Sequence, residues 1–150
     1  MITVVVLTGY LLSAAITDIL RKKIPVWLIV MGIFPVLLGI FMSLSGTDPG
    51  EVPEVVISHG AGALIGASFI PVSLMTREKL GKGDALLFTV CGGAAGYEKL
   101  MILIMSAFLL GALYAAAMLA MGRLTRKSSF AFAPFILAGY VMTEVLMHGG

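Results

Sequence analysis

Apolar stretches long enough to approach or reach the thickness of a lipid bilayer run through almost all of this chain. A membrane-spanning helix needs about 20 mainly apolar residues. Six stretches fit this description to differing degrees: Ile2–Leu20, Ile24–Leu44, Val55–Met75, Ala85–Tyr97, Leu100–Met121 and Phe130–Met147. Hydrophobic residues make up 59% of the chain and charged residues 12%, whereas a soluble domain carries about 25% charged residues. The composition therefore excludes a water-soluble globular protein.

The fourth stretch, Ala85–Tyr97, is the shortest, with 13 residues. One continuous helix from Ala85 to Met121 would be too long for a bilayer and would bury Glu98 and Lys99. A hairpin around residues 96–99 avoids both problems. Because lipid offers no hydrogen bonds to the backbone, we expect an all-α fold, a polytopic membrane protein with a bundle of six transmembrane helices. We expect residues 1–150 to form a single membrane-embedded domain.

The basic residues lie after alternate stretches. Nine of the ten Lys and Arg residues fall in the loops after the first, third and fifth stretches, and Lys99 is the exception. The loop after the second stretch is acidic, with Asp48, Glu51 and Glu54. The positive-inside rule then places the three basic loops in the cytoplasm and both termini on the extracytoplasmic side. We expect a multi-pass protein of the cell membrane, in contact with the lipid bilayer and with no nucleic-acid partner.

Acidic residues at membrane depth are costly and usually functional, so the place of each acid matters. Six of the eight acids lie in loops or near the outer interface, where solvated charge explains them: Asp48, Glu51, Glu54, Glu78, Glu98 and Glu144. Asp18 lies three residues before Arg21 at the end of the first stretch, and Asp84 lies two residues after Lys82 at the start of the fourth. The topology brings both to the cytoplasmic edge at similar depth.

Two carboxylates held close together cannot both ionise cheaply, so such a pair shares one proton. The ionised member can deprotonate water, and the protonated member can hydrogen-bond the carbonyl of a peptide bond and then protonate the leaving amine. This is aspartic peptidase chemistry, and we expect no metal and no cofactor. The alternative is that each acid only caps a helix or pairs with neighbouring bases, with Asp84 as the N-cap of the fourth stretch. Position alone leaves both interpretations open.

A short motif surrounds the second acid. Residues 81–84 read Gly-Lys-Gly-Asp, and Gly81 and Gly83 let the backbone turn sharply beside Asp84. Asp18 is followed several residues later by Ile24-Pro25. Together these features resemble the type IV prepilin peptidases, which are GxGD-type membrane aspartic proteases. The resemblance extends over essentially the whole chain, and its specific motifs cover about a dozen residues.

The resemblance implies an activity and a set of partners. Members of this family remove short basic leader peptides from pilin and pseudopilin precursors at the cytoplasmic face of a prokaryotic cell membrane, in type IV pilus and protein secretion systems. It implies that Asp18 and Asp84 are the catalytic pair and that Gly81 and Gly83 shape the active-site loop. Larger members carry paired CxxC motifs and also methylate the new N-terminus. Here Cys91 is the only cysteine, so we expect a short, peptidase-only form.

Two positions depart from the family pattern, which often has Asn after Ile-Pro and Lys two residues after the second Asp. Val26 and Leu86 stand there instead, and these differences concern loop contacts and substrate preference rather than the acids. We also expect the loop Thr76–Gly83 to act as a gate that brings Asp84 to Asp18 when substrate arrives.

Two other functions are consistent with a polytopic bundle. A small proton-coupled transporter would carry an acid near mid-membrane, whereas both acids here lie at one edge. An inactive assembly component of a pilus or secretion system is the second alternative, and the sequence leaves it open. His59 has no second histidine beside it, so we expect a hydrogen-bonded helix residue there rather than a metal ligand.

The charge pattern makes a prediction about topology. A reporter that is active only outside the cytoplasm should be active when fused after Gly150 and inactive when inserted near Lys79. A cytoplasmic signal at Gly150 would mean that one stretch does not cross the membrane, with the short fourth stretch as the first suspect.

Overall fold

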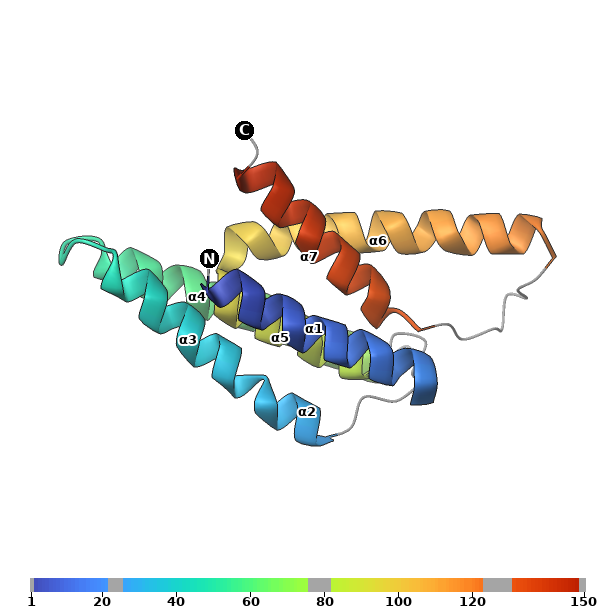
Figure 1. Cartoon of the computed structure of the whole chain (residues 1–150), viewed down its shortest axis with the longest axis horizontal. Helices are drawn as coiled ribbons and strands as arrows, with labels where there is room; N and C mark the ends of the chain where they lie inside the picture. Colours follow the sequence, from blue (N-terminus) through green and yellow to red (C-terminus); the bar gives the residue numbers. More distant parts are fainter. Residues whose placement is uncertain (1, 22–25, 76–81, 123–130, 149–150) are drawn as a thin grey trace.

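The structure is a computed structural model, and it describes residues 2–21, 26–75, 82–122 and 131–148. The helices, in chain order, are α1 (Ile2–Arg21), α2 (Val26–Met31), α3 (Ile33–Ser45), α4 (Val52–Met75), α5 (Lys82–Ala95), α6 (Tyr97–Ala120) and α7 (Ala133–His148), as Figure 1 shows. Within these ranges there is no β-strand. The prediction of an all-helical protein is therefore confirmed for the described part of the chain.

Three of these helices, α1, α4 and α6, are long and apolar enough to cross a membrane. The helices α3, α5 and α7 are apolar but shorter. Each of the six predicted stretches overlaps one of these helices, as expected for a multi-pass membrane protein. The six-span topology itself remains a prediction.

The second predicted stretch, Ile24–Leu44, is not one helix. It breaks at Gly32 into α2 and α3. Pro35 lies three residues after the break, and it lacks the N–H that would have bonded to the carbonyl of Met31 in a continuous helix. A missing hydrogen bond in the ladder is a common cause of a helix break.

The predicted hairpin between the fourth and fifth stretches is present, but it is tighter than expected. Helices α5 and α6 are joined by the single residue Gly96, whose φ of 84° is a conformation that favours glycine. The N–H of Gly96 donates to the carbonyl oxygen of Gly92 at 3.0 Å and closes α5. Tyr97, Glu98 and Lys99 therefore belong to the first turn of α6 rather than to a loop.

Glycines bring the backbones of α4 and α5 into direct contact. A Cβ atom added at Gly62 would collide with the carbonyl group of Gly92, and one added at Gly92 would collide with Gly62. A Cβ at Gly66 would lie 2.5 Å from the backbone of Phe88. Small residues at helix spacing allow this close approach in membrane proteins, so the glycine pattern of the sequence is explained by packing.

His59 links three helices through its ring. Its Nδ1 lies 2.9 Å from the carbonyl oxygen of Gly93 on α5, and its Nε2 lies 3.0 Å from the hydroxyl of Ser43 on α3. A carbonyl can only accept, so Nδ1–H donates to Gly93, and Nε2 shares a hydrogen bond with the Ser43 hydroxyl. His59 is buried, and this fits the predicted hydrogen-bonded histidine.

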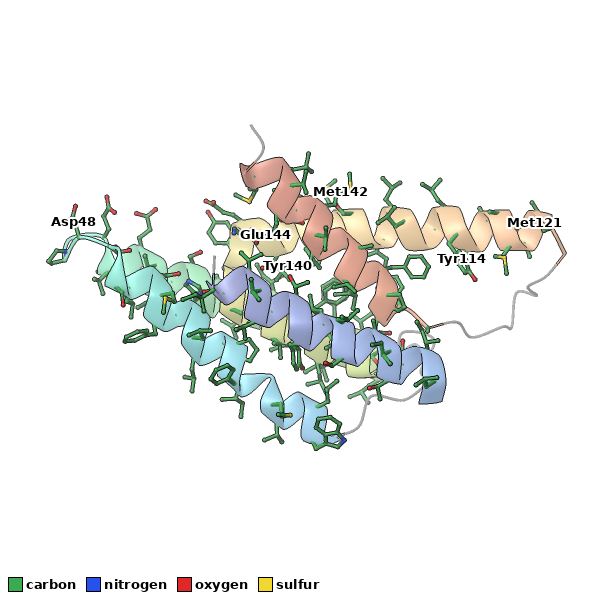
Figure 2. The ribbon with its side chains drawn as sticks, viewed as in Figure 1. Asp48, Tyr114, Met121, Tyr140, Met142 and Glu144 are labelled. Carbon is green, nitrogen blue, oxygen red and sulfur yellow. The ribbon has the colours of Figure 1, made fainter. Side chains whose placement is uncertain are left out.

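The last helix is anchored to α6 along its length. Gly139 of α7 sits so close to α6 that an added Cβ would lie 3.0 Å from the backbone nitrogen of Ala107 and from the carbonyl oxygen of Leu103. Near the end of α7, the carboxylate of Glu144, which Figure 2 labels, forms an ion pair with Lys99 at 2.9 Å. Glu144 thus has a protein partner, in addition to its place near the predicted outer interface.

The ends of the helices alternate between two sides of the molecule. The α3–α4 turn and the Gly96 turn lie toward one end in Figure 1, together with the start of α1 and the end of α7. The end of α1 and the starts of α5 and α7 lie toward the other end. Asp48 and Met121 mark opposite extremes in Figure 2. This up-and-down arrangement is the one that the alternating loop charges predict.

The glycine contacts give a matched pair of stability predictions. We expect Gly62→Ala to lower the free energy of unfolding by about 1–3 kcal/mol, because the new methyl group overlaps the Gly92 backbone. Gly60→Ala, two residues away on the same helix, meets nothing within 4 Å and should be neutral or slightly stabilising. Thermal unfolding in detergent measures both, and equal melting temperatures would contradict the packing argument.

Candidate active site

Asp18 is buried near the C-terminal end of α1, with 8% of its surface exposed. Its Oδ2 atom accepts a hydrogen bond from the backbone N–H of Ala133 at 3.2 Å. Ala133 is fully buried and is the first residue of α7, 115 positions further along the chain. This contact joins the end of one helix to the beginning of another.

The local sequence explains why α7 accepts an acid from another helix. The first N–H groups of any helix have no partner within that helix, and a side-chain oxygen just before the helix usually caps one of them. Phe132 precedes Ala133 and has no such oxygen. Its carbonyl oxygen accepts from the N–H of Phe135 at 2.9 Å, which starts the helical ladder. The Asp18 carboxylate supplies the missing acceptor, at a helix end whose partial positive charge favours an anion.

Asp84 lies in the first turn of α5 and is also buried, with 6% of its surface exposed. Gly83 precedes it and is half-buried, and it belongs to the first turn of α5 rather than to a loop, so the predicted loop to Gly83 ends too late in the sequence. Gly81, the other predicted loop residue, lies outside the described residues. So do the positions before it, back to residue 76, and the gate remains a prediction.

The structure places the two acids on helices that touch. Helix α1 packs against α5 and α7, and α5 also packs against α7. In Figure 1 the end of α1, which carries Asp18, and the start of α5, which carries Asp84, lie toward the same end of the bundle. The common edge predicted from the sequence agrees with this arrangement, and direct contact between the carboxyl groups stays a prediction.

Aromatic rings lie next to both acids along the chain. Phe88 follows Asp84 by one helical turn, and its ring centroid lies 5.3 Å from that of Phe69 and 6.3 Å from that of Phe132. Phe132 immediately precedes Ala133, the residue that binds Asp18. These rings thus join α4, α5 and the residue before α7 in one aromatic cluster.

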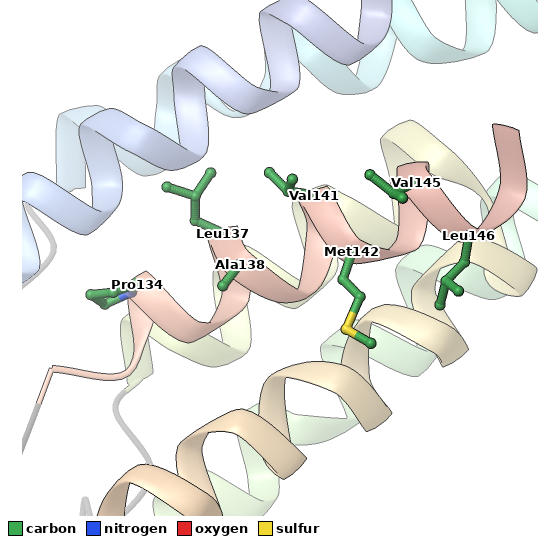
Figure 3. A pocket seen from close by; sticks show the side chains of 7 residues that line it. All are labelled: Pro134, Leu137, Ala138, Val141, Met142, Val145 and Leu146. Atoms are coloured by element: carbon green, nitrogen blue, oxygen red, sulfur yellow. The ribbon is translucent and has the colours of Figure 1, made fainter. Parts of the chain in front are cut away.

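The acids are not part of a metal-binding cluster in the described residues, where no group of three or more His, Cys, Asp or Glu side chains gathers. Cys91 is buried within α5. A surface groove follows α7, and Figure 3 shows that its wall is apolar: Pro134, Leu137, Ala138, Val141, Met142, Val145 and Leu146. This groove has no group able to transfer a proton, so the acids are the better candidates for chemistry.

Two contacts between helices were not predicted from the sequence: the bond from Ala133 to Asp18, and the ion pair of Lys99 with Glu144. The Ala133 N–H is a backbone group far from Asp18 in the chain, so no side-chain pattern indicates it. The pairing of Lys99 with Glu144 had a signal, because Lys99 is the one basic residue outside the three basic loops and Glu144 lies near the same predicted face.

Comparisons with known proteins identify the family. The model of the type IV leader peptidase family matches residues 5–116. A curated relative, the prepilin leader peptidase/N-methyltransferase of Bacillus subtilis (strain 168), is 38% identical over 82 residues. That alignment covers 54% of this chain and 33% of the relative, so the chain matches about a third of the relative's length. No solved structure matches the chain. Since the family model covers well over half of the residues, including Asp18 and Asp84, the chain belongs to the type IV leader peptidase family.

Proposed function

We propose that this protein is an aspartic endopeptidase that cleaves the leader peptide from type IV pilin-like precursors, with Asp18 and Asp84 as the catalytic pair. The observation that carries the proposal is the burial of both acids on touching helices that meet at one end of the bundle. Family membership supports a peptidase, and the curated relative is named as a prepilin leader peptidase.

The proposed reaction uses one ionised and one protonated carboxyl group. The ionised group takes a proton from water, and the water oxygen attacks the carbonyl carbon of the scissile bond. The protonated group donates a hydrogen bond to the carbonyl oxygen as charge develops there. When the C–N bond breaks, a proton passes to the amine, and the pair again holds one proton. Proton transfer of this kind contributes about 10²–10⁴-fold to a rate.

The proposal includes a membrane arrangement. Six helical segments cross the bilayer as one domain over residues 1–150, with both termini outside and the acids at the cytoplasmic face of a prokaryotic membrane. The loop charges and the alternating helix ends support this arrangement. Lipid covers the apolar outer faces, including the groove along α7 in Figure 3.

The position of the acids suits a substrate whose leader is polar and whose next segment is an apolar helix. A peptide bond inside a helix is shielded, so it must be locally unwound before water can attack it. A site near one end of the bundle can receive such a junction as it leaves the bilayer. We therefore propose pilin and pseudopilin precursors as the protein partners, as family membership suggests.

We propose cleavage without methylation. The paired CxxC motifs that accompany methylation in larger members have no counterpart in these 150 residues, where Cys91 is the single cysteine. The function of the curated relative as an N-methyltransferase is not carried over to this chain.

The acids can be tested one at a time. Asp18→Asn and Asp84→Asn should each lower the rate of precursor cleavage by about 100-fold or more, because each removes one proton-transfer group. Asp48→Asn, in the turn at the opposite end of the molecule, is the matched control and should cleave normally. The measurement is conversion of a pilin-like precursor by purified protein in detergent, with protein amounts matched.

Either Asn variant cleaving at the normal rate would reject the pair. If instead the unaltered protein fails to cleave pilin-like precursors, the inactive assembly component becomes the better interpretation.

Metal removal gives an independent prediction. Both roles in the proposed reaction belong to carboxyl groups, so dialysis against a strong chelator should leave the cleavage rate unchanged. A loss of activity that is restored by adding a divalent cation would show that the acids act as metal ligands, contrary to the proposal.

A further inference from the structure

We propose that the start of α7 positions Asp18 for catalysis through the backbone N–H of Ala133. This inference rests on the proposed function, in which Asp18 is one of the two reacting acids. It adds a positioning group, Ala133, that lies outside the motifs around either acid. The carrying observation is the 3.2 Å hydrogen bond from Ala133 N–H to Asp18 Oδ2, between two buried residues.

The donor is unusually well suited to fix an acid in place. A backbone N–H at the start of a helix has no side-chain torsions, so it moves only if the helix moves. Ala133 is the first residue of α7 and has no exposed surface. The position before it is Phe132, which offers no capping oxygen of its own. Cap side chains usually accept from the second or third N–H of a helix, but the second residue of α7 is Pro134 and the N–H of Phe135 already donates to Phe132. Asp18 instead accepts from the first N–H.

Helix α7 is itself held firmly. Gly139 lies against the backbone of α6 at Ala107, and the ring of Tyr140, one residue further on, is 1% exposed. At the other end of α7 the Glu144–Lys99 ion pair ties it to the start of α6. A helix packed along its middle and tied near its end presents its first N–H at a fixed point, and α1 packs against that helix.

Holding one oxygen defines what the other can do. A carboxylate has two oxygens, and the bond to Ala133 engages Oδ2. Rotation of the carboxyl group is then restricted. In this proposal Oδ1, which has no hydrogen bond among the described residues, serves water or the proton shared with Asp84. Misplacing a reacting group by about 1 Å can cost about 100-fold in rate. Loss of this bond should therefore lower the turnover rate more than it changes substrate binding.

The competing explanation is a purely structural cap that only joins α1 to α7. In that case, removing the N–H would lower stability, while the protein that remains folded would cleave normally. The value of kcat per folded molecule separates the two explanations, so the amount of folded protein is measured beside the rate. A positioning group changes kcat, whereas a structural contact changes the amount of folded enzyme and leaves kcat per folded molecule unchanged.

The test compares Ala133→Pro with Ala133→Gly in the purified full chain, using a pilin-like precursor as substrate. Proline lacks the N–H but is well tolerated at the first position of a helix, whereas glycine keeps the N–H and removes only a methyl group. We expect Ala133→Pro to lower kcat by about 10- to 100-fold with KM within about twofold of the unaltered value. Ala133→Gly should stay within about threefold in both.

The proline ring also adds bulk beside a buried carboxylate, so a second variant decides the case. Replacing residue 133 by lactic acid through suppressor-tRNA incorporation turns the amide into an ester, which deletes the N–H without adding volume. The inference predicts the same loss of kcat in this variant, with helix content unchanged by circular dichroism. A kcat within twofold of normal, or a rise in KM alone, would overturn it.

The catalytic pair and the positioning role of Ala133 can be rejected separately. If Asp18→Asn still cleaves, the proposed catalytic pair is wrong and the positioning role falls with it. If Asp18→Asn is inactive but the ester variant turns over normally, the pair stands and only the role of Ala133 is rejected.

Discussion

Burying a carboxylate inside a helical bundle is the constraint on which the rest of this structure depends. An ionised group removed from water is costly unless hydrogen bonds replace its hydration. Asp18 lies at the end of α1 in a chain with few charged residues, and the first N–H of α7 supplies one replacement. The hydrogen bond between Asp18 and Ala133 places the start of α7 beside the end of α1. It also links residues 115 positions apart, and so it joins the start of the last helix to the end of α1.

The glycines set the second constraint, because they decide how α5 is placed. Gly62 and Gly92 let the backbones of α4 and α5 touch, and His59 adds a hydrogen bond from α4 to the carbonyl of Gly93. Helix α5 is short, with 14 residues, and it packs between longer neighbours. Its depth in the bundle follows from these contacts, and Asp84 sits in its first turn. The glycine packing thus sets the depth of Asp84 in the bundle.

Much of the fold could be predicted from the sequence, because apolar length and loop charge act locally. The helices and the hairpin near Gly96 follow from such signals, whereas the burial of Asp18 and Asp84 is a finding of the structure. Pro35 in the second stretch predicts a kink, but the continuous apolar pattern does not place a break at Gly32. The contact with Ala133 was missed for a deeper reason. Backbone donors are present at nearly every residue, so only the three-dimensional packing selects the one that is used.

The choice of backbone partners also explains how an apolar bundle accommodates buried polar side chains. Several of its hydroxyl side chains are turned back on their own helices, as when Thr17 donates to the carbonyl of Ser13 at 2.7 Å. Groups used in this way satisfy the local backbone and cannot also serve another helix. Two buried polar side chains reach across helices to backbone atoms instead, Asp18 to the N–H of Ala133 and His59 to the carbonyl of Gly93. The first uses a free helix start, and the second uses a carbonyl that a glycine leaves uncovered. A backbone partner introduces no further charge into the apolar bundle, so the bond from Ala133 holds Asp18 without adding an ion of its own.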